Sequence, residues 1–291
     1  MKTKLICGLV ALELVCSNTA SVFAADSVKN TENDNKTVSS TNFTNEDGYT
    51  TEHTTNPKDF PSGITEKDRK AHEYFQQREA ELKLINSDSR SLARALGGSK
   101  YLKYDKRYSP EKQKHGNWCG PAAALNAIDT RSYHSTGKNT SLTQDILANE
   151  VHFKVADFID QTSFDSKWPA ILNKYAPGNN YQLKREPSYS ASQWEDVLMQ
   201  SIVSTIDKGF PVIVDTKQAA NTAFLTPAYR NRYNSNGNKP IYHYITVIGY
   251  MSHNNGQYFI NFMDSAGFNH GVYTVSLRQL AKASYPYGIV Y

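Results

Sequence analysis

The sequence has very little cysteine. Three cysteines occur in 291 residues, and Cys7 and Cys16 both lie in an apolar N-terminal stretch. If that stretch is removed, Cys119 is the one cysteine that stays, which excludes an internal disulfide. A lone thiol in an exported protein is either a buried apolar residue or a nucleophile.

Residues 1–24 are typical of a secretory signal. Lys2 and Lys4 precede an apolar run, and small residues occupy the positions before Ala25, so cleavage is expected there. The run is shorter than the roughly 20 apolar residues that a membrane span requires. We therefore expect a secreted, extracellular protein without stable membrane insertion.

Several other signatures are missing. The formal net charge is only +4, and no run of five or more Lys or Arg occurs, so binding to nucleic acid is not indicated. The sequence has no His-Glu-x-x-His, no Gly-x-Ser-x-Gly and no phosphate-binding loop. No metal and no cofactor is predicted. No wall-binding repeat or sorting signal is visible, which leaves association with the cell wall open.

Composition divides the chain into four parts. After the signal, residues 25–64 are polar and predicted to be disordered. Residues 65–98 are predicted to form a helical arm or prosegment. Its first helix is broken at residues 86–88, and a short second helix ends at Gly97 and Gly98. Residues 99–291 are rich in aromatics and are predicted to form the main domain.

Helices come first in this domain and strands afterwards. The period of 3.6 residues predicts helices near 119–128, 142–150, 166–175 and 193–208. Strands are expected near 210–215, 241–250, 257–264, 271–276 and 287–291, with a short helix near 277–282 and a long polar loop over 216–239. This order predicts an α+β fold with helices packed on a C-terminal antiparallel sheet.

The segment 113–119 combines a thiol with the start of a helix. Cys119 lies in the predicted first turn, where the helix dipole favours a thiolate. Gln113 precedes it by six residues across a glycine-containing loop. Its side-chain amide, with the backbone N–H of Cys119, is predicted to bind the oxyanion of a reacting carbonyl.

A thiol nucleophile needs a base, and His243 is the best candidate. It lies in a predicted strand, and a hairpin leads from there to Asp264 at the end of the next strand. We expect Asp264 to orient the imidazole from the strand end, where a carboxylate has no burial cost. Asn261 is the weaker alternative because it lies on the other strand face. His115 is expected to line a cleft or to be exposed, and the remaining histidines, His53 included, to have no catalytic role.

These pieces together resemble a known family. Gln113, Cys119–Ala123, Lys208–Val214, His243–Tyr250 and Asp264 occur in the order found in papain-superfamily cysteine peptidases of the double-glycine (bacteriocin-leader) peptidase-like group. The resemblance implies a papain-like fold and catalysis through a thiol acyl-enzyme. It does not imply the leader-peptide substrate, because the leader peptidases are fused to a transporter on the cytoplasmic side.

The sequence thus predicts a secreted cysteine peptidase with a protein or peptide substrate. Cell-wall peptide hydrolysis, amidase action or transglutaminase-like transfer on the same fold is an alternative, and so is a non-catalytic binding or adhesin module. A further hypothesis is cleavage after Gly98, because residues 92–99 resemble a double-glycine cleavage site. A glycine-capped helix and linker explains the same residues.

Overall fold

The computed structural model describes residues 52–88, 98–149, 151–156, 161–185, 187, 189–253 and 256–291. The predicted signal, most of the predicted disordered segment and the proposed second helix of the arm lie outside these residues. So does most of the site proposed for cleavage, of which Gly98 and Ser99 are described. No helix of the described part combines the length and the apolar character that a membrane crossing needs.

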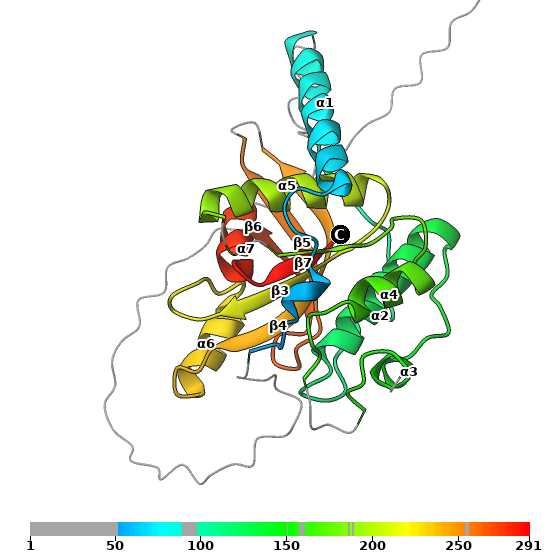
Figure 1. Cartoon of the computed structure of the whole chain (residues 1–291), viewed down its shortest axis with the longest axis vertical. Coiled ribbons are helices and arrows are strands. Elements are labelled where there is room, and N and C mark those ends of the chain that lie inside the picture. The colour runs from blue at the N-terminus through cyan, green and yellow to red at the C-terminus, as the bar shows by residue number, and fades with distance from the viewer. Residues whose placement is uncertain are drawn as a thin grey trace, which may run out of the picture. The chain divides into compact units, whose positions relative to one another are not determined.

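A twisted antiparallel sheet forms the centre of the chain (Figure 1). The strand order is β2-β7-β3-β4-β5-β6, and β1 also pairs with β4. The strands are β1 Lys100–Tyr101, β2 Leu183–Lys184, β3 Val212–Gln218, β4 Ile241–Ser252, β5 Tyr258–Asp264, β6 Gly271–Ser276 and β7 Gly288–Val290. The side chains of β3, β4 and β5 are mostly buried on both faces of the sheet, whereas those of the edge strand β6 are mostly half-buried.

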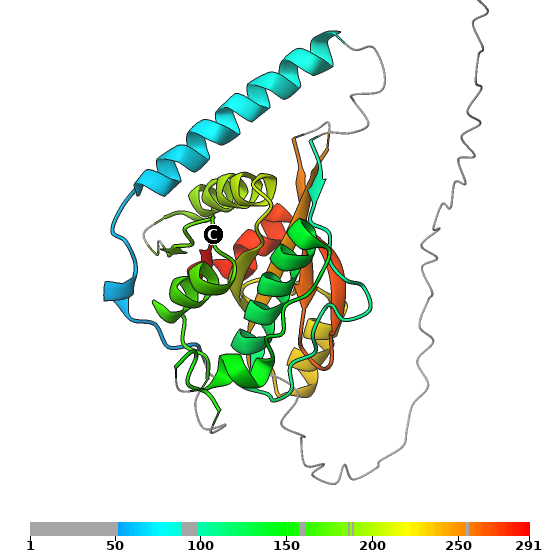
Figure 2. The ribbon, with the colours of Figure 1, turned by 90° about the vertical axis from the view of Figure 1, so that its right-hand side faces the viewer.

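Helices pack on both faces of this sheet (Figures 1 and 2). The helices of the described residues are α1 Glu66–Asp88, α2 Cys119–Thr136, α3 Gln144–Ala148, α4 Lys167–Tyr175, α5 Ala191–Asp207, α6 Pro227–Ser235 and α7 Leu277–Ser284, with a short 3-10 helix at Pro57–Asp59. Of these, α1 packs on α5 and α3 packs on α2. One apolar cluster unites α5 and α7 with Val214, Ile245 and Phe262, and another unites α2 and α4 with Ile213 and Tyr244. The predicted α+β class, helices on a C-terminal antiparallel sheet, is confirmed.

The helices form where local signals and apolar faces agree. Ser190 caps α5, with Gln193 completing a reciprocal capping box, and the buried side chains of Trp194 and Leu198 lie on the sheet-facing side. Helix α2 is buried from Cys119 to Thr130, and its alanines let it approach β4 closely. A central helix with this burial fixes the position of its first residue.

Two parts differ from the sequence-based expectation. The segment 216–239 is not one long loop, because β3 extends to Gln218 and α6 begins at Pro227. The sequence indicates the start of this helix, because Thr226 is the N-cap and Pro227 is the first helical residue. The second difference concerns residues 52–64, which composition placed in a disordered segment. They lie along the main domain instead. The buried His53 side chain bonds to Asp215, and the carbonyls of Thr54 and Gly63 accept hydrogen bonds from the main domain.

Candidate active site

Cys119 is the first residue of α2. Trp118 is the N-cap residue, and its indole Nε1 donates to Val155 O at 2.9 Å, which ties the loop before the helix to a neighbouring segment. The first N–H groups of a helix have no partner within it, so they favour negative charge at this end. The Cys119 side chain is nearly closed off, with 5% of the residue exposed.

Gly120 allows the helix start to approach another part of the chain. A Cβ at this position would lie 2.2 Å from the side chain of Thr162, closer than any ordinary contact. Thr162 belongs to the loop 161–166, and its carbonyl accepts from the hydroxyl of Tyr244 at 2.9 Å. The glycine after the thiol is therefore a steric requirement of this packing.

His243 and Asp264 come together across the β4–β5 hairpin. The imidazole Nε2 lies 3.1 Å from Asp264 Oδ1, and both side chains are almost fully buried. Since Nε2 faces the carboxylate, Nδ1 is the ring nitrogen left for the thiol. Asn261, the alternative orienter, points to the other strand face and donates to Thr274 Oγ1 at 2.7 Å.

Asp264 is more buried than the sequence suggested. Its position at a strand end was expected to avoid a burial cost, yet the residue is 0% exposed. The cost is offset by donors: Tyr229 Oη at 2.7 Å, Asn269 Nδ2 at 2.9 Å and the Ala266 N–H at 2.8 Å. These bonds hold the carboxylate towards His243.

Tyr229 and Asn269 are site residues that sequence reasoning missed. Tyr229 comes from α6, inside the segment taken for a loop, and no motif identifies it. Burial and the neighbouring Asp264 raise the pKa of its hydroxyl well above the ordinary value, so it remains a donor. Thr226 Oγ1 in turn donates to Asn269 Oδ1 at 2.8 Å, which extends the network by one more residue.

A second histidine also reaches the thiol. His53 Nε2 lies 3.7 Å from Cys119 Sγ, and His53 Nδ1 lies 2.8 Å from Asp215 Oδ1 on β3. Its ring stacks on Tyr244 with centroids 4.1 Å apart and an interplanar angle of 6°. The sequence assigned His53 to a disordered segment without a catalytic role, and no local pattern distinguishes it.

The two imidazoles and the thiol set one another's protonation. Burial raises the pKa of the Cys119 thiol, but hydrogen bonds from His243 and His53 outweigh burial and bring it down to about 6. Burial lowers the pKa of His243, and the charge of Asp264 overcomes this and raises it to about 9. Burial also lowers the pKa of His53, and the charge of Asp215 overcomes this and raises it to about 10. A thiolate between imidazolium groups is favoured at neutral pH.

Gln113 lies close to the loop that precedes Cys119. It is 1% exposed, and its Nε2 donates to His115 O and to Gly116 O, each at 3.0 Å. Both amide hydrogens are thus directed at loop carbonyls, while Oε1 is buried without a partner among the described residues. In this geometry Gln113 shapes the loop, and it reaches an oxyanion only by giving up one of these bonds.

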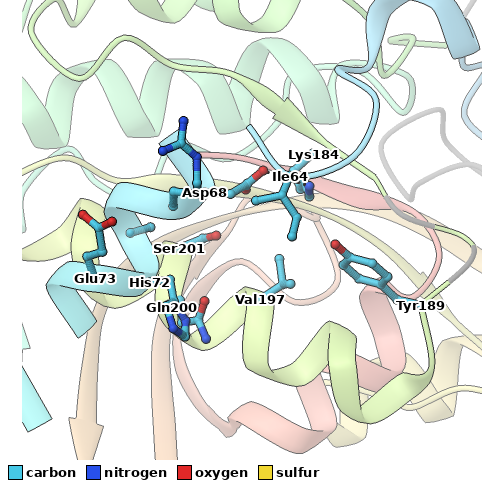
Figure 3. A pocket seen from close by; sticks show the side chains of 11 residues that line it. Ile64, Asp68, His72, Glu73, Lys184, Tyr189, Val197, Gln200 and Ser201 are labelled. Atoms are coloured by element: carbon cyan, nitrogen blue, oxygen red, sulfur yellow. Dashed lines mark hydrogen bonds and ion pairs between the residues drawn. The ribbon is translucent and has the colours of Figure 1, made fainter. Parts of the chain in front are cut away.

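An apolar pocket lies apart from the thiol site. It has a volume of about 420 Å³ and lies between the first turns of α1 and the α5 helix (Figure 3). Ile64 and Val197 line it, with Lys184 and Asp68 paired at 2.9 Å. None of its lining residues belongs to the thiol site. Among the described residues no group of three or more His, Cys, Asp or Glu is placed to hold a metal ion.

Comparison with known proteins gives a family match over most of the main domain. Residues 106–287, more than half of the chain, match the Peptidase_C39 like family. No curated protein matches the sequence.

Solved structures of plant cysteine proteases are similar at a low level. The proform of Amb a 11, a ragweed pollen allergen, is 12% identical with a TM-score of 0.39 over 71% of this chain and 67% of that one. Recombinant stem bromelain precursor is 15% identical with a TM-score of 0.38, over 68% and 70%. Bromelain from Ananas comosus with the E64 inhibitor is 15% identical with a TM-score of 0.37, over 67% and 97%. At these scores the likeness carries no argument about the site.

Proposed function

The chain belongs to the Peptidase_C39-like family of cysteine peptidases, and we propose that it is a secreted enzyme that hydrolyses peptide bonds through an acyl-enzyme on Cys119. One observation carries the proposal. The lone thiol of the main domain starts a helix, and it lies beside a histidine that lowers its pKa and that a buried carboxylate holds in place.

The proposed reaction has two steps. The Cys119 thiolate attacks the peptide carbonyl carbon, and the His243 imidazolium gives its proton to the leaving amine as the C–N bond breaks. His243 then takes a proton from water, whose oxygen attacks the thioester carbon; the C–S bond breaks, the carboxylic acid is released, and the thiolate–imidazolium pair is restored. Asp264 keeps the imidazole in one tautomer and stabilises its charged form.

The oxyanion forms beside the start of α2. The backbone N–H of Cys119 is the first proposed donor, since helix N-terminal groups point towards negative charge there. Gln113 is the second, and it exchanges one loop carbonyl for the oxyanion. Replacing Gln113 by Ala is expected to lower kcat more than it raises KM, because the bond exists only in the transition state.

Export is the remaining element of the proposal. It is supported by the residue pattern of 1–24 and by the lone thiol that cleavage would leave. Mass spectrometry of protein collected from a culture medium is expected to show Ala25 at the N-terminus. An N-terminus at Ser99 in the wild type but not in Cys119→Ala would support cleavage after Gly98 instead.

A digest decides the reaction. Full-length wild type and Cys119→Ala are incubated with a peptide library, with purified peptidoglycan and with amine acceptors. We expect peptide fragments with wild type and none with Cys119→Ala. Release of wall peptides alone, or amine incorporation without hydrolysis, would replace the proposed function by one of its acyl-transfer alternatives. If no product forms with any of these substrates, the non-catalytic binding module is the alternative that stays.

A further inference from the structure

The segment before α1 runs past the thiol. We call residues 52–64 the strap. Phe164 N–H donates to Thr54 O at 2.8 Å, Thr54 Oγ1 contacts Ser163 Oγ at 2.7 Å, and Lys184 Nζ donates to Gly63 O at 2.9 Å. Of the strap, all of which the structure describes, His53 alone is buried. A segment whose other residues are exposed or half-buried thus inserts one imidazole next to the thiol sulfur.

The imidazole fills a slot that other residues build. Tyr244 is one wall, with its ring stacked on His53 and its hydroxyl fixed on Thr162 O. Asp215 is the floor, and Cys119 lies on the remaining side, 3.7 Å from His53 Nε2. Asp215 and Tyr244 are directly opposite each other in the β3–β4 register, so the rigid sheet determines their spacing.

Asp215 is only half satisfied by this arrangement. It is 0% exposed, and Oδ1 bonds to His53 Nδ1, but Oδ2 is buried without a hydrogen-bond partner among the described residues. A buried carboxylate without donors is unfavourable by several kcal/mol. The floor of the slot therefore has unused capacity to accept a second N–H.

A guanidinium has the chemistry that the groups around His53 would bind. It is planar and cationic, it stacks on aromatic rings, and its forked donors can bond both oxygens of one carboxylate. His53 supplies the planar cation and one of the two bonds. An arginine side chain would supply both and would place the peptide that carries it next to Cys119 Sγ.

We propose that the slot formed by Asp215 and Tyr244 is a substrate subsite for an arginine side chain, and that His53 occupies this subsite until substrate displaces the strap. The inference rests on the proposed peptidase function for its substrate and on the geometry of the slot for its chemistry. Asp215 is then a specificity-determining residue, and His53 leaves the thiol before the bond-breaking step.

The test uses peptide pairs and full-length variants. Peptides that the wild type cleaves are made with Arg or with citrulline, its neutral planar isostere, near the cleaved bond. In His53→Gly we expect Arg to be preferred by about tenfold to a hundredfold in kcat/KM, the value of a charge-assisted pair. In His53→Gly with Asp215→Asn this preference is expected to disappear. His72→Gly, on an exposed turn of α1, is the control for loss of a histidine.

A second readout does not depend on hydrolysis. At a pH above the thiol pKa of both proteins, iodoacetamide should alkylate Cys119 about tenfold faster or more in His53→Gly than in wild type, because the fraction with the strap closed is lost. Millimolar guanidinium should slow alkylation of His53→Gly, whereas urea, of similar shape but neutral, should not. Asp215→Asn, which leaves the strap sequence intact, should by itself speed alkylation and should abolish the guanidinium effect in the double variant.

The outcomes separate the two proposals. Equal cleavage of Arg and citrulline peptides with no guanidinium protection overturns the subsite while peptide hydrolysis stands. Guanidinium protection that needs Asp215, without any peptide cleavage, supports the slot and overturns the peptidase. Loss of hydrolysis in His53→Gly, with His72→Gly active, also overturns the subsite, because His53 would then belong to the catalytic machinery.

Discussion

Cys119 has an imidazole–carboxylate pair on each of two sides, and the two pairs are built differently. His243 and Asp264 both come from the β4–β5 hairpin, and Asp264 has three further donors, from Tyr229, Asn269 and the Ala266 N–H. His53 comes from the strap, and its partner Asp215 has one oxygen without a donor.

This difference suggests that His243 has a fixed position, whereas His53 can be replaced by another donor to Asp215. A carboxylate with several donors from its own domain holds one geometry, which proton transfer to and from a thiol requires. A carboxylate whose hydrogen bond comes from an otherwise exposed segment can exchange that partner for another. Burial and charge are alike in the two pairs, so the number and origin of the donors distinguish them.

The largest expected effect comes from removing each imidazole in turn. His243→Ala should lower kcat/KM by about 10³-fold or more, because the general base and acid are lost together. His53→Gly should lower it far less on an arginine peptide, because the guanidinium then takes the place of the imidazole on Asp215. Steady-state kinetics on one cleaved peptide measures both. A comparable loss in the two variants would contradict the distinction between the pairs.

Tyr229→Phe tests the support of Asp264. The substitution removes a buried bond to a carboxylate and should lower the free energy of unfolding by about 1.5–3 kcal/mol. Tyr233→Phe on the same helix is the control, expected to change it by less than about 0.5 kcal/mol. Urea denaturation followed by circular dichroism gives both values. Equal stability of the two variants would show that the bond is not a support.

Gly120→Ala perturbs the other side of the thiol. Its Cβ would meet Thr162 at 2.2 Å, and overpacking of this kind costs about 1–3 kcal/mol. The displaced loop carries Ser163 and Phe164, which hold Thr54 of the strap, so alkylation of Cys119 should also become faster. Adding Thr162→Gly should recover part of the stability. If the double variant is no more stable than Gly120→Ala, the contact with Thr162 is not the cause of the destabilisation.

The smallest effect is a shift along the pH axis. Only the thiolate reacts with iodoacetamide, so the alkylation rate rises with pH through the thiol pKa. Its midpoint in wild type is expected near pH 6. Removing the cation in His53→Gly should move the midpoint upward, and so should His243→Ala, because both imidazoles lower this pKa. A wild-type midpoint near 8.5, the ordinary thiol value, would contradict the ion pair.

Local patterns made the His243 side of the site predictable. Cys119 at a helix start, a period-two strand through His243 and a hairpin to Asp264 are all features of neighbouring residues. The face shared by His243 and Asp264 follows from alternation along antiparallel strands. Tyr229 was missed although Thr226 and Pro227 signal the start of its helix, because such a signal does not say which buried group a tyrosine will meet.

The sequence by itself determined the α+β layout, the lone thiol of the main domain and the strand positions of its predicted base and orienter, since each depends on residue type and period within one segment. Only the tertiary structure decided that His53 reaches Cys119. The two residues are 66 positions apart, and the segment around His53 is polar without any period. Its position comes from a charge on β3, a ring on β4 and polar contacts with loop 161–166, and no local pattern encodes such a combination.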